Sequence, residues 1–431
     1  RNFSIKPMPG KVLIITYYWP PSGGAGVQRW LKFTKYLPSS GWLPVVLTVM
    51  PEYAAYPVRD PSLYGDVPLD VVVHRTRAIN YFSLYSKDQS KIPSSGFASE
   101  SPRGKISAIS RFIRGNFFIP DPRKGWNKYA FRKACELIKS ENIRHVITTS
   151  PPHSTQLIGL RLKKRFPHLR WVADLRDPWT DIYYYGMFHP TLLAKMADRA
   201  MERRVLAKAD LILTVGNSLA SLFASKVPDI EDKIHVILNG YDEEDFEGIA
   251  STVPERFTVT YVGTLSEAYP VKSFLEAARG FAAGGTPLHL RFVGSVPDPV
   301  RAKIREESKG CTTEFIPYSD HPVAIKHMMS TSLLVMIIPD HPSGKSIITG
   351  KLFEYMASGK PVLFIGPVDG DAAHLLARCG YKGIYGYDNE KGILDFIRSI
   401  SDGAIQNPVR QPNEYSRRAL TNRLESLLNF S

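Results

Sequence analysis

The chain has 431 residues, of which 43% are hydrophobic and 22% charged, a globular composition long enough for two domains. No apolar run reaches the roughly 18–20 residues of a membrane-spanning helix, no signal-peptide pattern opens the sequence, and three widely separated cysteines lack metal-ligand spacing, so we expect a cytoplasmic protein with reduced thiols. The net charge of +14 is uneven, because residues 101–170 contain 16 Lys and Arg against 3 Asp and Glu.

The first half of the chain alternates β-branched runs with helical periods, which is the pattern of parallel α/β layers. Apolar residues recur at helical spacing over residues 27–37, and strands are predicted at 11–16, 42–49, 145–150, 171–175 and 211–215. Residues 76–125 break this rhythm with Ser, Pro and basic residues, which indicates an insertion.

A second series of strands and helices follows in the other half of the chain. Strands are predicted at 257–263, 288–294, 313–318, 333–339 and 361–366, with helices starting near 270, 297, 321, 350 and 371. Two such series predict an α/β protein of two Rossmann-like domains, at residues 1–245 (with the insertion at about 76–125) and 246–412. A last helix is predicted over the tail, residues 413–431.

The segment SGKSIITGKLFEYMASGKPVL (343–363) places three lysines and three glycines in and around an apolar helix, which is predicted over residues 350–358 and ended by Gly359. Lys351 and Glu354 share one face, and helical side chains lean toward the N-terminus. Free N–H groups and the helix dipole favour an anion there. We interpret the segment as a cradle for a nucleotide diphosphate, with Glu354 accepting hydrogen bonds from the ribose. The alternative is an exposed Lys–Glu pair on a surface helix.

Several segments together resemble the family 4 glycosyltransferases. GKLFEYMASGKPVL resembles their donor-binding signature, and supporting segments occur in order along the chain: YYWPPSGGAGVQRWLKFTKYL, ITTSPPHSTQLIGL, ADLRDPWT, ADLILTVGNSLA, VILNGYD and TYVGTLSEAYPVKSFLEA. The resemblance covers about residues 11–430 and implies the GT-B fold, two Rossmann-like domains facing across a cleft. It also implies that the C-terminal domain binds the sugar nucleotide, that the N-terminal domain binds the acceptor, and that the tail helix returns to the N-terminal domain.

Two departures from the family pattern change the predicted donor site. The first of the family's two glutamates would fall at 346, where this chain has Ser346, and the usual Arg and Lys after the first C-terminal strand correspond to Thr264 and Tyr269. The cationic role then passes to Lys345 and Lys351. The predicted donor-binding residues are Glu354, Gly350, Lys345, Ser346, Gly263 and Thr264, with Lys351 stabilising the departing diphosphate.

The loop PPSGGAGVQRW (20–30) follows the first strand, and its Gly23, Gly24 and Gly26 permit close approach of a phosphate or sugar. Its spacing is not G-x-G-x-x-G, and strand 42–49 lacks the acid that binds a dinucleotide ribose, which argues against an NAD enzyme. With Arg29, the loop is predicted to face the acceptor. The alternative is a tight strand-to-helix turn.

The polar residues of ADLRDPW (173–179) emerge at the carboxyl end of a strand, where α/β folds bind ligands. Asp174, Arg176 and Asp177 are therefore catalytic candidates, together with His153 at the end of the preceding strand. The alternatives are an internal ion pair and a structural histidine. The resemblance implies retaining transfer in which the donor's phosphate takes the acceptor proton, so these residues would align the acceptor.

The basic segment GKISAISRFIRGNFFIPDPRKGW (104–126) mixes aromatic and aliphatic residues with Lys and Arg. Its apolar positions 106, 109, 113 and 117 approximate one helical face flanked by arginines, and Tyr81, Phe82, Leu84 and Tyr85 lie upstream. This pattern predicts an interfacial helix on an anionic membrane surface. A solvated basic face is the alternative, and nucleic acid is not expected because no binding motif accompanies the charge.

These patterns together predict a glycosyltransferase of bacterial surface-glycan type. It would move a hexosyl or related sugar from a nucleotide-diphosphate donor to a glycan or lipid-diphosphate-linked acceptor, with retention, at the inner face of the membrane. No cofactor or metal is expected, because no Asp-x-Asp motif directly ends a strand of the second series. The alternative is a GT-B protein without transferase activity that binds sugar nucleotides or acts as a partner subunit.

Overall fold

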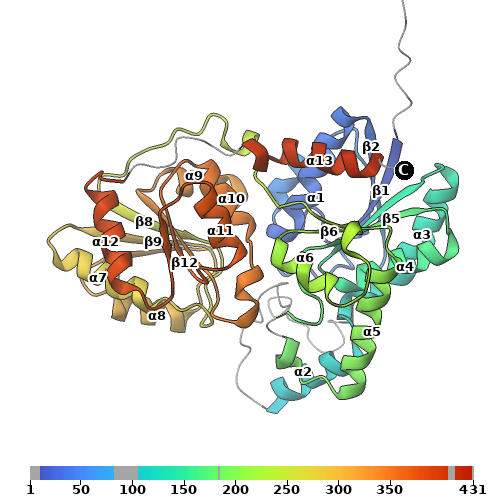
Figure 1. Ribbon diagram of the computed structural model, residues 1–431, viewed down its shortest axis with the longest axis horizontal. Helices are drawn as coiled ribbons and strands as arrows, with labels where there is room; N and C mark the ends of the chain where they lie inside the picture. Colours follow the sequence, from blue (N-terminus) through green and yellow to red (C-terminus); the bar gives the residue numbers. More distant parts are fainter. Residues whose placement is uncertain (1–9, 82–104, 183–184, 406–412, 430–431) are drawn as a thin grey trace, which may run out of the picture. The chain divides into compact units, whose positions relative to one another are not determined.

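The computed structural model describes residues 10–81, 105–182, 185–405 and 413–429. The chain divides into two compact units, residues 1–238 with 418–431, and residues 239–417 (Figure 1). The division at 238/239 lies before the boundary at 245/246 that the sequence suggested. Each unit is described by itself below.

The first unit is built on a seven-stranded parallel sheet with the order β3-β2-β1-β4-β5-β6-β7. Residues 12–15 of β1 are fully buried and continuously apolar, as expected for a strand that is covered on both faces. The strands of this sheet are β1 (Gly10–Ile15), β2 (Trp42–Val49), β3 (Val72–Thr76), β4 (His145–Ser150), β5 (Arg170–Leu175), β6 (Leu211–Thr214) and β7 (Ile234–Val236).

Helices flank both faces of this sheet (Figure 1). The helices of this unit are α1 (Ala25–Tyr36), α3 (Asn127–Ser140), α4 (Gln156–Arg165), α5 (Leu192–Lys208), α6 (Asn217–Ala224), the last helix α13 (Arg417–Asn429), and α2 (Lys105–Phe117), which packs against α5. Helix α13 packs on the first unit, where Trp42 Nε1 donates to Asn429 Oδ1 at 3.2 Å and Arg170 Nη2 donates to the Leu427 carbonyl at 3.1 Å.

The second unit repeats this architecture with a six-stranded parallel sheet of order β10-β9-β8-β11-β12-β13. Its strands are β8 (Phe257–Val262), β9 (Leu288–Val293), β10 (Thr312–Ile316), β11 (Leu333–Ile337), β12 (Val362–Ile365) and β13 (Gly383–Tyr385). Its helices are α7 (Lys272–Ala283), α8 (Asp298–Glu307), α9 (His321–Met329), α10 (Gly350–Ala357), α11 (Asp371–Arg378) and α12 (Glu390–Ser401). The α/β class with two parallel-sheet units, predicted from the sequence, is therefore confirmed.

The strand order reverses once in each sheet, between the paired strands β1 and β4 in the first unit and between β8 and β11 in the second. Open parallel sheets bind ligands outside the carboxyl ends of their strands at such a reversal. The loops that follow these four strands contain several of the residues singled out above, whereas Asp174, Arg176 and Asp177 lie at the end of β5 and in the loop after it. Among the described residues no helix combines the length and apolar character needed to cross a membrane.

Candidate functional site

Helix α10 begins at the carboxyl edge of the second sheet, after β11 and the short 3₁₀ helix Pro342–Ser346. Its N-cap, Thr349, makes no side-chain hydrogen bond to the first turn. A side-chain carbon added at Gly350 would meet no atom within 4 Å, so the first turn faces open space. The first turn of α10 is therefore a candidate site for an anion. The helix ends at Gly359, whose φ of +66° closes the last turn.

The Lys351 ammonium turns toward β8 and lies 4.8 Å above the centre of the Tyr261 ring. It packs so closely on Gly263 that a side-chain carbon added there would lie 2.3 Å from Nζ, and the φ of +126° at Gly263 also favours glycine. No carboxylate of the described chain lies within ion-pair distance of Lys351. Burial lowers the pKa of Lys351 from its ordinary 10.5 to about 8, against the opposing effect of Glu354.

Glu354 accepts a hydrogen bond from His321 Nε2, 3.0 Å from Oε1. The sequence had suggested that both head groups point back to the helix start. In the structure the two side chains have different partners, the Tyr261 ring for Lys351 and His321 for Glu354. Sequence reasoning missed His321, because α9 carries no motif that distinguishes it.

Three of the other predicted donor residues already have partners within the second unit. Lys345 Nζ lies 2.5 Å from Asp369 Oδ2, with both side chains more than half exposed, and Ser346 Oγ donates to the Ser343 carbonyl at 2.9 Å. The Thr264 carbonyl accepts a hydrogen bond from the Tyr261 hydroxyl at 2.8 Å. None of these side chains contacts Lys351 or Glu354 in the described structure.

One Asp-x-Asp sequence, Asp369-Gly370-Asp371, does follow β12 at a short distance, which the sequence reading had not considered. Asp369 pairs with Lys345, and Asp371 stands in the first turn of α11. Over the described ranges, no group of three or more His, Cys, Asp or Glu side chains is arranged to hold a metal ion.

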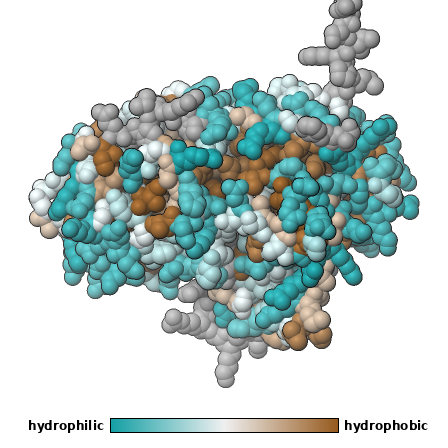
Figure 2. Space-filling view, viewed as in Figure 1, coloured by the Kyte–Doolittle hydropathy of each residue, from teal (hydrophilic) through white to brown (hydrophobic). Residues whose placement is uncertain are grey.

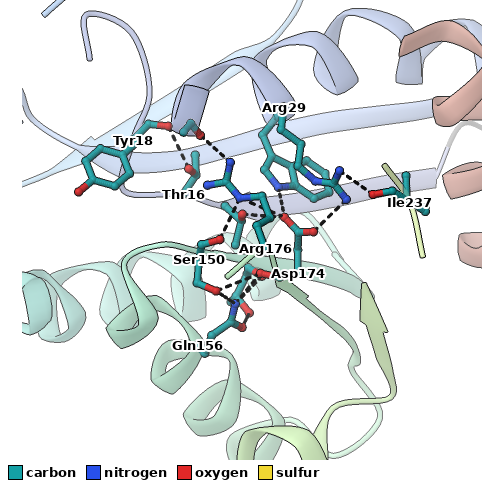
Figure 3. Close-up of polar contacts among 12 residues, drawn as sticks. Thr16, Tyr18, Arg29, Ser150, Gln156, Asp174, Arg176 and Ile237 are labelled. Atoms are coloured by element: carbon teal, nitrogen blue, oxygen red, sulfur yellow. Dashed lines mark hydrogen bonds and ion pairs between the residues drawn. The ribbon is translucent and has the colours of Figure 1, made fainter. Parts of the chain in front are cut away.

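Asp174 in the first unit is fully buried and accepts three side-chain hydrogen bonds at the end of β5 (Figure 3). Its donors are Arg29 Nη2 at 3.0 Å, Trp30 Nε1 at 2.7 Å and Thr149 Oγ1 at 2.7 Å. Arg29, also fully buried, donates to the Ile237 and Leu238 carbonyls as well, so it joins α1 to the end of β7. Neither side chain reaches solvent, and we assign both a positioning role in place of the ligand contact suggested by the sequence.

Arg176, which follows β5, forms hydrogen bonds to the end of β4 and to the segment after β1. Its Nε donates to the Ser150 carbonyl at 2.9 Å and its Nη1 donates to the Gly26 carbonyl at 3.1 Å, which orients the glycine loop (Figure 3). In that loop the Gly23 N–H donates to the Val58 carbonyl, and Gly24 has a φ of +84° with open space at its Cα. Gly24 is thus the glycine that faces outward, whereas Gly23 is buried.

Asp177 and His153 are predicted residues of the first unit with polar atoms that make no hydrogen bond to the described chain, and Arg176 has one such atom, Nη2. Asp177 is half-buried without a hydrogen-bond partner in the described chain, and burial raises the pKa of its carboxyl group. His153 stacks on Trp179 with ring centres 5.0 Å apart, and its buried Nδ1 has no partner among the described residues. Burial, assisted by Lys226 and Arg176, lowers the pKa of His153 to about 3, so its ring is neutral.

His153 and Trp179 line a cavity of about 80 Å³ that sequence reasoning did not anticipate. Asp198 of α5 also lines it and accepts hydrogen bonds from Trp179 Nε1 at 2.7 Å and from the Tyr185 hydroxyl at 3.0 Å. Burial raises the pKa of Asp198 to about 6. The small polar cavity can accept a hydroxyl group or water, with the ring of Tyr18 forming another part of its wall.

The buried pair Arg29–Asp174 generates a prediction about stability. Asp174→Asn leaves the Arg29 guanidinium buried without a counter-charge, and we expect a loss of about 3–5 kcal/mol in the free energy of unfolding. Urea unfolding followed by circular dichroism measures it. The matched change Glu136→Gln removes an exposed carboxylate, 2.5 Å from Lys133, and is expected to cost less than about 1 kcal/mol. Equal stability of Asp174→Asn and the native chain would contradict a positioning role.

Comparisons with known proteins agree with this architecture. The sequence model described as Glycosyltransferase Family 4 matches residues 93–245, and comparison with curated proteins gave no match. A glycosyltransferase from Rickettsia africae has a similar structure over 98% of this chain and 99% of its own, with 12% identity and a TM-score of 0.61.

Two further solved structures are similar over nearly their whole length. The structure of Anabaena HepE in complex with UDP and glucose matches 97% of this chain and 99% of the HepE chain, with 13% identity and a TM-score of 0.58. The structure of WaaG, a glycosyltransferase involved in lipopolysaccharide biosynthesis, matches 97% of this chain and 100% of the WaaG chain, with 12% identity and a TM-score of 0.54. The comparisons confirm the resemblance seen in the motifs: residues 93–245 are similar in sequence to family 4 glycosyltransferases, and the chain has the GT-B fold.

Proposed function

We propose that this protein is a glycosyltransferase that moves a sugar from a nucleoside-diphosphate donor to a glycan or lipid-linked acceptor. The observation that carries the proposal is the Lys351 ammonium, desolvated and without a carboxylate partner in the described structure, beside the open first turn of α10. A half-buried cation and the N–H groups of a helix start at a strand-order reversal suit a diphosphate. The UDP and glucose bound by Anabaena HepE, which shares the fold, support this class of donor.

The roles of the donor-site residues follow from their geometry. Lys351 and the first-turn N–H groups of α10 would neutralise the diphosphate. Gly350 leaves room for it, and Gly263 leaves room for the Lys351 side chain. Glu354, only 19% exposed, keeps its second oxygen for a ribose hydroxyl. In the transfer step the bond between the anomeric carbon and the diphosphate oxygen breaks, and charge grows on that oxygen. Lys351 stabilises this charge more in the transition state than in the ground state.

The acceptor would bind to the first unit. There the loops fixed by Asp174 and Arg176 would orient it, and the half-buried Asp177 and the neutral His153 keep polar atoms for its hydroxyl groups. We propose transfer with retention, in which the leaving diphosphate takes the acceptor proton, so that no side chain has to act as a base. We also propose that the reaction needs no metal ion.

A non-catalytic, nucleotide-binding role is the second candidate. Ser346 replaces an expected glutamate and bonds within its own turn, and Lys345 is paired with Asp369 instead of being directed to the diphosphate. These observations remove two of the groups that would contact the sugar and the phosphates. Transfer of a sugar by the purified protein separates the two candidates.

The basic segment is proposed to attach the protein to an anionic membrane surface. In α2 the side chains of Phe112, Ile113 and Phe117 are exposed, as are Leu192, Leu193 and Met196 at the start of α5. Asn116 joins the two helices, because its side chain donates to the His189 carbonyl and accepts from the Thr191 N–H. Figure 2 shows hydrophobic side chains gathered at this end of the first unit.

The structure modifies the predicted interfacial helix in two ways. Arg114 stacks on the Phe188 ring at 3.9 Å and Lys124 donates to the Phe117 carbonyl, so neither projects freely toward lipid. The exposed Lys195, Arg199 and Arg203 of α5 supply basic charge beside the apolar group instead. Phe82, Leu84, Tyr85 and the side chains at 106 and 109 lie outside the described residues.

The donor proposal predicts one stabilising nucleotide in a thermal-shift panel of UDP-, GDP-, ADP-, CMP- and dTDP-sugars. A hundredfold excess over the dissociation constant raises the free energy of unfolding by about 2.7 kcal/mol. Sugar transfer or hydrolysis of the same compound, unchanged by EDTA, is the expected activity. Binding without turnover under any acceptor would favour the non-catalytic candidate, and no shift with any compound would reject both.

Lys351 predicts a pH dependence of binding. Its pKa is lowered in the folded protein to about 8, so the ammonium that attracts the diphosphate is lost as pH rises through that value. Affinity for the nucleoside diphosphate should fall by up to about tenfold per pH unit above pH 8. Calorimetric titrations between about pH 7 and 9.5 measure this slope, and Lys351→Met should bind weakly with a flat profile. The same slope in both proteins would assign the titration to another group.

The membrane proposal predicts that the protein binds vesicles containing anionic lipid and not neutral ones, and that about 1 M salt weakens binding through screening. The triple variant Phe117→Gln, Leu192→Gln, Leu193→Gln should lose vesicle binding in flotation assays and keep transfer to a soluble acceptor. Leu69→Gln, which alters a fully exposed leucine elsewhere on the unit, is the matched control. Undiminished flotation of the triple variant would remove this surface as the contact.

A further inference from the structure

His321 stands between two carboxylates contributed by different elements of the second unit. Its Nε2 lies 3.0 Å from Glu354 Oε1 on α10, and its Nδ1 lies 3.9 Å from Asp245 Oδ2 in the 3₁₀ helix Glu243–Phe246. All three side chains are less than one fifth exposed. An ionised carboxylate only accepts hydrogen bonds, so the 3.0 Å contact requires a hydrogen on Nε2. The 3.9 Å separation from Asp245 is too long for a hydrogen bond.

The orientation of Glu354 depends on His321 and not on the neighbouring lysine. Lys351 contacts the Tyr261 ring on β8 and makes no ion pair with Glu354 in the described structure. Residues 321 and 354 lie 33 positions apart, and the start of α9 brings the imidazole to the carboxylate. Of the two Glu354 oxygens, Oε1 is therefore held by the protein and Oε2 remains for a ligand.

We propose that His321 is a positioning residue that fixes the Glu354 carboxylate so that it recognises the ribose of the nucleotide donor. This inference rests on the proposed function. A carboxylate held by a second side chain loses less freedom when it binds, and its free oxygen is already aimed. His321 thereby contributes to the choice between ribose and deoxyribose without contacting the ligand.

A positioning role for His321 predicts selectivity for ribonucleotides over 2′-deoxynucleotides, which an ion pair with only a structural role would not affect. A ribose hydroxyl that donates to Glu354 is absent from a 2′-deoxynucleotide. Variants that disorient Glu354 should therefore weaken binding of the ribonucleotide and leave binding of the deoxynucleotide unchanged. From the cost of ordering one side chain, we expect His321→Leu to reduce ribonucleotide affinity about three- to tenfold. Removal of the acceptor itself in Glu354→Ala should reduce it about 10- to 100-fold.

The experiment compares UDP, GDP and ADP with their 2′-deoxy counterparts by calorimetric titration of the full chain. The native protein should prefer one ribonucleotide over its deoxy form. That preference should shrink in His321→Leu and vanish in Glu354→Ala, and affinity for the deoxy form should stay within about twofold. His321→Gln, whose amide N–H can still donate to Glu354, should keep most of the preference.

Controls separate the possible failures. His327→Leu makes the same change farther along α9 at a half-buried position, and it should leave both affinities unchanged. Urea unfolding of each variant identifies any loss of fold. If no ribonucleotide binds the native chain, the proposed nucleotide site fails. If the native chain discriminates and His321→Leu discriminates equally, or if both nucleotides weaken in parallel, the positioning role of His321 is overturned while the nucleotide site stands.

Discussion

Parallel pairing brings the carboxyl ends of all strands in a sheet to one edge, and the polar groups gathered there have to be satisfied or left for a ligand. The two units differ in how these polar groups are paired. In the first, Asp174 at the end of β5 receives Arg29, Trp30 and Thr149, and the fully buried carboxylate is neutralised from within. In the second, Lys351 beside the end of β8 lies over an aromatic ring, and no carboxylate of the described chain is within ion-pair distance of it.

Whether a polar side chain is already paired within the protein distinguishes structural residues from candidate binding residues better than residue type does. Asp174 and Arg29 have the chemistry of catalytic residues, but their hydrogen bonds already join β5, α1 and the end of β7. Removing either one leaves a buried charge, which costs much more than the pair contributes. Lys351, Asp177 and His153 keep capacity that the protein does not use, and such capacity at a strand-order reversal is the physical mark of a binding surface.

The sequence predicted those parts of the fold that local pattern controls. Buried strands such as β1 and β12 contain continuous apolar runs, and α10 is bracketed by glycines, so their bounds were close to those observed. The edge strand β3 and the three-residue strands β7 and β13 were missed, because partly exposed residues there form no such run. Asp174 was placed correctly at the sheet edge, but its burial depends on Arg29, 145 positions away. No local pattern reports a contact over that separation, nor the approach of His321 to Glu354.

The half-buried ammonium of Lys351 lowers the stability of the second unit. Its pKa is lower in the folded unit, about 8, than the ordinary 10.5, so holding the ammonium destabilises the fold. The penalty is complete below pH 8, where lysine is charged in both states, and it fades as pH rises from 8 toward 10.5 because the folded unit then keeps the amine neutral. At neutral pH a bound diphosphate would supply the missing counter-charge and offset that penalty. A neutral side chain at position 351 would not lower the stability of the unit in this way. The ammonium is therefore better explained by binding of a ligand than by a contribution to stability.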